Sequence, residues 1–123
     1  MGWRDSHMQN FIKAFRYAFE GILHAVKTER NFKFHLIAAG IVILSGLLTG
    51  LADFEWYIIL VLIGGVLSLE LLNSAIERVV NLVTMERLPL AKQAKDLAAG
   101  AVLIFAIFSA VIGLLIFIPK WIP

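Results

Sequence analysis

The fold is decided by residues 56–83, which read WYIILVLIGGVLSLELLNSAIERVVNLV. The first half is apolar and uncharged, and a helix of this length can cross a hydrocarbon core of roughly 30 Å. Polar residues enter the second half at spacings of three and four positions, so they share one helix face. They are Glu70, Asn73, Ser74, Glu77 and Asn81. Because an ionisable group within a membrane span is costly, this polar face is a candidate functional site.

The rest of the chain has the composition of a membrane protein. Its 123 residues suit a single domain, 1–123, and 60% of them are hydrophobic. A soluble domain of this size has too much surface to hide so many apolar side chains. The net charge of +2 is too small to indicate nucleic acid binding, and the absence of cysteine excludes disulfides and thiolate chemistry.

Three further segments have the lengths and patterns of helices. Residues 10–30 place aromatic and aliphatic side chains on one face and mostly basic ones on the other, which is typical of a helix at a membrane surface. Residues 34–52 and 97–118 are apolar and long enough to span a bilayer. The sequence therefore predicts an all-α membrane protein with one surface helix and three transmembrane helices, at 34–52, 56–83 and 97–118.

The basic residues predict how these spans are oriented. Ten of the eleven Lys and Arg residues lie in two blocks, 4–33 and 78–95, while the 52–55 turn carries only acidic charges. The positive-inside rule then places the N-terminus and the 78–95 segment in the cytoplasm and the C-terminus outside. Individual charges at the span ends, Lys27, Lys33, Arg78 and Lys120, are interpreted as topological anchors. His7, His24 and His35 lack metal-ligand spacing and are expected to be solvated or interfacial.

This topology brings several charged residues to the cytoplasmic surface. They are Glu29, Glu77, Glu86, Lys95 and Asp96, with Glu70 just beneath them. Two carboxylates together with substrate phosphates are a common way to hold Mg²⁺, and Glu29 and Glu77 are the natural pair. Glu70 would act as a general base toward a hydroxyl arriving from the lipid phase, and Lys95 would neutralise phosphate.

The residues alone leave three classes of function open. These are a membrane enzyme acting on a lipid hydroxyl, a proton-coupled transporter using Glu70, and a non-catalytic assembly subunit. A transporter is expected to show internal repeats or interrupted spans, and neither is evident. Asn73 and Ser74 would equally serve as interhelical hydrogen-bond formers. The Lys95-Asp96 pair and the surface helix favour the enzyme.

The stretch ELLNSAIERVVN at 70–81 resembles the signature of the small bacterial integral-membrane lipid kinases, approximately E-x-[LI]-N-[ST]-A-[IL]-E-x-x-V-D. The resemblance extends over about residues 10–120. It includes ERNFKFH at 29–35, PLAKQAKDLAAGAV at 89–102 and IGLLIFIPK at 112–120, which look like the Gram-positive branch. One position departs from the signature, since Asn81 stands where the family has Asp. Any charge-dependent role of that position is therefore in doubt here.

The resemblance implies a homotrimer in the bacterial plasma membrane that transfers the γ-phosphoryl group of Mg-ATP to a lipid alcohol. The branch implies undecaprenol as acceptor, yielding the phosphorylated carrier used in cell-envelope synthesis, with diacylglycerol as the alternative. Carried over by position, Glu70 matches the general base, and Asn73 a residue that orients it or the substrate. The nucleotide and metal residues would be Tyr17, Glu29, Glu77, Glu86, Lys95 and Asp96, with Glu29 and Glu77 as the magnesium ligands.

Overall fold

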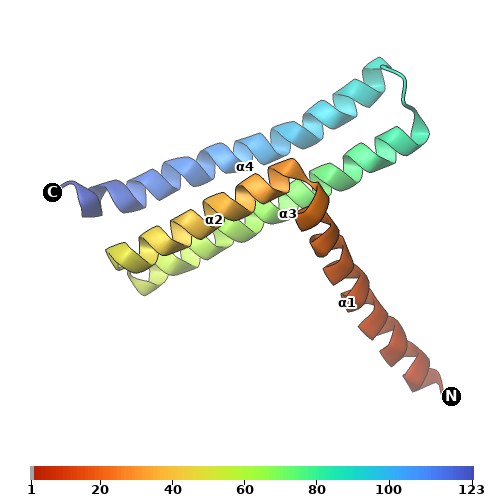
Figure 1. Cartoon of the computed structure of the whole chain (residues 1–123), viewed down its shortest axis with the longest axis horizontal. Helices are drawn as coiled ribbons and strands as arrows, with labels where there is room; N and C mark the ends of the chain where they lie inside the picture. Colours follow the sequence, from red (N-terminus) through yellow and green to blue (C-terminus); the bar gives the residue numbers. More distant parts are fainter. Residues whose placement is uncertain (1) are drawn as a thin grey trace.

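A computed structural model describes residues 2–123, which form four helices. They are α1 (Trp3–Thr28), α2 (Arg30–Thr49), α3 (Asp53–Val83) and α4 (Pro89–Trp121). Helices α2, α3 and α4 run alongside one another, and α1 projects away from one end of this group (Figure 1). The prediction of an all-α protein is confirmed for the described residues.

Helices α2, α3 and α4 are each long and apolar enough to cross a membrane. Many of their large apolar side chains are exposed in the single chain. Such a continuous apolar exterior is expected where lipid or another protein chain covers it. Helix α1 begins at Trp3, earlier than the sequence pattern indicated, and its aromatic residues Phe11, Phe15 and Phe19 are also exposed.

A single residue separates α1 from α2. Glu29 has an extended backbone conformation, with φ −94° and ψ 111°, so it ends α1 and also begins α2. The chain changes direction sharply at this residue (Figure 1). The Glu29 side chain is therefore fixed at a corner of the fold.

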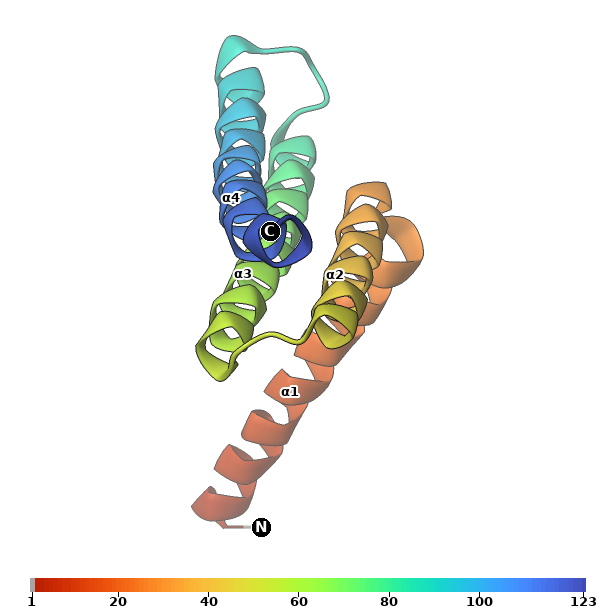
Figure 2. The same ribbon diagram turned by 90° about the vertical axis from the view of Figure 1, so that its left-hand side faces the viewer.

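Helix α3 is the central helix of the group. It makes its most extensive contacts with α4, and it also packs against α2 (Figure 2). Two glycines permit these approaches. A Cβ atom added to Gly65 would overlap the ring of Phe105 on α4, and one added to Gly46 of α2 would lie 2.7 Å from the Trp56 ring of α3. Small residues that let helices approach closely are a common device of membrane proteins.

The end of the group opposite Glu29 is held by two polar contacts. Lys120 Nζ lies 2.9 Å from Glu55 Oε1, and Trp121 Nε1 donates a hydrogen bond of 2.8 Å to Thr49 Oγ1. These contacts join the end of α4 to the start of α3 and to the end of α2. Lys120 is therefore paired across helices, beyond the anchoring role expected from its position.

Candidate functional site

The first part of the polar face of α3 points into the protein, whereas Glu77 and Asn81 farther along it are exposed. Glu70, Asn73 and Ser74 are all buried, with 3%, 6% and 4% of their surface exposed. The neighbouring apolar residue Leu72 is mostly exposed instead. Because a carboxylate in an apolar setting needs a polar partner, the burial of Glu70 raises the question of what lies beside it.

That partner comes from α2 and is His35. Its Nε2 atom lies 3.8 Å from Glu70 Oε2, and 18% of its side chain is exposed. Sequence reasoning treated His35 as solvated or interfacial and did not connect it with Glu70. Nothing in the spacing along the chain pairs two residues on different helices. The register in which α2 packs on α3 decides the contact.

Asn73 continues the polar face by one turn. Its Nδ2 atom donates a 3.5 Å hydrogen bond to Glu77 Oε1, while its Oδ1 atom is buried without a hydrogen-bond partner among the described residues. Leaving a buried acceptor unsatisfied costs about 1–3 kcal/mol. The side chain is thus prepared to accept a hydrogen bond from a donor that is not part of this chain's own packing.

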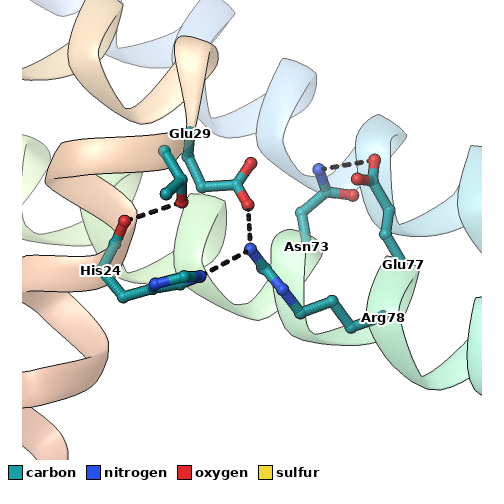
Figure 3. Close-up of polar contacts among 6 residues, drawn as sticks. His24, Glu29, Asn73, Glu77 and Arg78 are labelled. Atoms are coloured by element: carbon teal, nitrogen blue, oxygen red, sulfur yellow. Dashed lines mark hydrogen bonds and ion pairs between the residues drawn. The ribbon is translucent and has the colours of Figure 1, made fainter.

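A second polar cluster lies at the corner between α1 and α2. Arg78 of α3 extends its guanidinium between the carboxylate of Glu29 and the ring of His24, as Figure 3 shows. Its Nη2 atom lies 2.5 Å from Glu29 Oε1 and 3.4 Å from His24 Nε2. Sequence reasoning gave Arg78 only an anchoring role. Here Arg78 connects α3 to His24 of α1 and to Glu29 at the junction of α1 and α2. Glu29 is the carboxylate that was expected to bind a metal.

The predicted magnesium ligands fit the ion by chemistry. Carboxylate oxygens are the ligands that Mg²⁺ prefers, and one or two of them commonly suffice when substrate phosphates supply the rest. The described residues contain no group of three or more His, Asp or Glu side chains able to hold a metal by themselves. In this structure the Glu29 carboxylate accepts a hydrogen bond from Arg78, and the Glu77 carboxylate accepts one from Asn73.

The other predicted nucleotide residues lie on three different elements. Asp96 Oδ2 of α4 accepts a hydrogen bond of 2.5 Å from Lys92 Nζ. Lys95 makes no hydrogen bond or ion pair with the described residues. Glu86 is exposed in the 84–88 connection between α3 and α4. Tyr17 is exposed on α1, with Arg16 over its ring at 5.3 Å. Because α1 makes no substantial contact with α4, one chain does not bring Tyr17 together with Lys95 and Asp96.

Comparison with known proteins identifies relatives over nearly the whole chain. The sequence pattern of a family described as prokaryotic diacylglycerol kinase matches residues 16–117. An undecaprenol kinase of Bacillus subtilis is 54% identical over 115 residues, which are 94% of each chain. A diacylglycerol kinase of Synechocystis is 39% identical over 111 residues, 89% of this chain and 63% of that relative. A diacylglycerol kinase of Haemophilus influenzae is 30% identical over 102 residues, 83% and 86% of the two chains.

Proposed function

Because the chain belongs to the prokaryotic diacylglycerol kinase family and is therefore a membrane lipid kinase, we propose that it phosphorylates undecaprenol at the cytoplasmic face of the membrane. The observation that carries the choice of acceptor is the 54% identity to an undecaprenol kinase over 94% of both chains. The more distant relatives named diacylglycerol kinase make diacylglycerol the alternative acceptor. Membership of a kinase family replaces the transporter and assembly-subunit hypotheses.

Glu70 is the general base in this proposal. It lies buried on the polar face of α3, and Glu77 follows it by seven residues, about 10 Å along the helix axis. Glu70 is therefore the carboxylate that meets a hydroxyl whose lipid chain remains in the bilayer. It accepts the hydroxyl proton as the lipid oxygen bonds to the γ-phosphorus, and the bond from phosphorus to ADP breaks.

Asn73 acts beside it. Its buried Oδ1 atom has no partner among the described residues, so it can accept a hydrogen bond from another donor on a bound substrate, while the single proton of the reacting hydroxyl goes to Glu70. Its amide nitrogen donates a hydrogen bond to Glu77, which orients that carboxylate one turn farther along the polar face. Positioning of this kind is the main contribution that a protein makes to phosphoryl transfer.

Glu29 and Glu77 hold the divalent metal, for which we propose Mg²⁺. When bound, the ion neutralises charge on the β- and γ-phosphates and so assists their transfer. The nucleotide itself is bound by residues from several elements. Lys95 contacts phosphate as a point charge, Asp96 is its neighbour in the site, and Tyr17 and Glu86 supply further contacts.

The working enzyme is a homotrimer with sites shared between neighbouring copies. Support comes from the separation of α1, which carries Tyr17, from α4, which carries Lys95 and Asp96. A site that uses all three residues needs more than one chain. The N-terminus is cytoplasmic and the C-terminus external, as the distribution of Lys and Arg predicts.

The test is lipid phosphorylation by the purified protein in lipid bilayers. Labelled ATP is supplied with undecaprenol or with diacylglycerol at equal mole fraction, and the labelled lipids are separated. Greater transfer to undecaprenol supports the proposal, whereas a clear preference for diacylglycerol overturns the choice of acceptor. Glu20→Gln is the control for carboxylate variants, because Glu20 is exposed on α1 and contacts only Arg16.

A further inference from the structure

Arg78 contacts a proposed metal ligand, Glu29, and the proposed mechanism gives it no role. We propose that Arg78 is a nucleotide-binding residue, which holds Glu29 in the free enzyme and moves to the phosphates when the metal-nucleotide complex binds. This inference rests on the proposed lipid kinase function. It concerns a residue that sequence reasoning regarded as an anchor.

The first argument is the contact itself. The guanidinium reaches from α3 to the corner residue Glu29, and its Nη2 atom makes both contacts, at 2.5 Å to Glu29 and 3.4 Å to His24 (Figure 3). A guanidinium has five N–H donors. Those on Nε and Nη1 make no hydrogen bond or ion pair with the described residues, so they remain able to bind a second acceptor.

The second argument is access. The Arg78 side chain is 52% exposed, while the Glu29 side chain is 23% exposed. A solute arriving from water therefore meets the free edge of the guanidinium first. The planar fork of arginine matches phosphate oxygens, which it binds by paired hydrogen bonds.

The third argument is the balance of charge at the corner. If Glu29 bound a divalent cation while Arg78 stayed in place, two positive groups would share one carboxylate at short distance and repel each other. Transfer of Arg78 to a phosphate removes this conflict. Glu29 then faces the metal, Arg78 faces the phosphates, and every charge has an opposite neighbour.

If Arg78 moves from Glu29 to a phosphate, its loss should affect metal binding and nucleotide binding in opposite directions. A purely structural contact would not produce this result. In Arg78→Gln, binding of Mn²⁺ without nucleotide should become tighter, because no guanidinium competes for Glu29. Binding of Mg-ATP should weaken by about 10- to 100-fold, as expected for loss of charged hydrogen bonds. Both are measured on the full-length protein in lipid nanodiscs, by electron paramagnetic resonance for Mn²⁺ and by equilibrium dialysis with labelled ATP.

Two further variants make the test decisive. Arg87→Gln is the matched control, because Arg87 is exposed in the 84–88 connection and its side chain makes no hydrogen bond or ion pair with the described residues. Both affinities should equal those of the parent. Arg78→Lys keeps the charge but loses the fork, so its affinity for Mg-ATP should fall by about threefold or more even if Arg78→Gln does not fold.

The proposal is overturned if Mg-ATP affinity in a folded Arg78→Gln stays within twofold of the parent, or if Mn²⁺ and Mg-ATP binding weaken together. The second result would mean that Arg78 only stabilises the position of Glu29 between α1 and α2. These measurements need no lipid acceptor. Failure of the parent protein to phosphorylate any lipid alcohol would therefore reject the proposed function without deciding the role of Arg78.

Discussion

The carboxylate of Glu70 on α3 lies 3.8 Å from the imidazole of His35 on α2, measured from Oε2 to Nε2. This separation is longer than a hydrogen bond and within the range of an ion pair. Catalytic hydrogen bonds are often long in a free enzyme and tighten in the complex with substrate. A small movement would let His35 donate a hydrogen bond to the Glu70 carboxylate and orient it, and the first two predictions test the roles of these two residues.

Glu70→Gln should lower turnover by about 10²- to 10⁴-fold with little change in nucleotide affinity. Glutamine keeps the shape of the side chain but cannot accept the hydroxyl proton. The measurement is lipid phosphorylation at saturating Mg-ATP, with nucleotide binding measured separately. Parental turnover in this variant, alongside a normal Glu20→Gln control, would remove Glu70 from the chemistry.

His35→Gln should lower turnover by about tenfold and leave nucleotide affinity unchanged, since His35 acts only through Glu70. The informative experiment is a double-mutant cycle. In the Glu70→Gln background the second change should cost almost nothing, because the group to be oriented is already inactive. Fully additive losses in the double variant would show that His35 acts elsewhere.

Glu29→Gln and Glu77→Gln should each weaken Mg-ATP binding and turnover, because each removes one of the two carboxylates proposed to bind the metal. Asn81→Asp should be tolerated, since that position is already uncharged here and lies at the end of α3 beyond both carboxylates. Nucleotide titration at several Mg²⁺ concentrations checks this. An unchanged dependence on Mg²⁺ in both glutamine variants would exclude these residues from the metal site.

Gly65→Ala should destabilise the protein by about 1–3 kcal/mol, because the new methyl group overlaps the Phe105 ring and the tight contact between α3 and α4 must open. Gly64→Ala is the natural control, since a Cβ atom there meets no other atom within 4 Å. Thermal unfolding in the same detergent compares the two. Equal melting temperatures would contradict the packing described for Gly65.

The N-terminus should be cytoplasmic and the C-terminus external. The chain contains no cysteine, so Asp5→Cys and Ile122→Cys can each be labelled alone. A membrane-impermeant maleimide added to intact cells should react at position 122 and at position 5 only after lysis. Labelling of both positions from the outside would contradict three crossings.

Much of this architecture could be predicted from the sequence because it depends on local patterns. The long apolar stretches and the polar face of α3 follow from composition and helical periodicity, and the burial of Glu70, Asn73 and Ser74 agrees with that face. The partners of the site residues could not be predicted. His35 meets Glu70 through the packing of α2 on α3, which periodicity does not specify.

The corner at Glu29 shows again that local patterns do not predict the partner of a site residue. A charged ERNFK stretch predicts a joint between helices, but it does not reveal that the joint is one residue long. That short break fixes the direction of α1 and leaves the Glu29 carboxylate within reach of Arg78. Sequence reasoning could therefore predict Glu29 as an acidic ligand and still miss its basic partner, Arg78.

Helix α3 has 31 residues and so measures about 46 Å, well beyond a hydrocarbon core of roughly 30 Å. In the proposed topology this excess length would carry Glu77 and Arg78 into water and leave Glu70 at the level of the lipid. On this arrangement the nucleotide would reach the enzyme by diffusion in three dimensions through water, and the lipid alcohol by diffusion in two dimensions within the membrane. Saturation by the acceptor should then follow its surface density, so diluting it with inert phospholipid slows the reaction even when the amount in the vessel is constant.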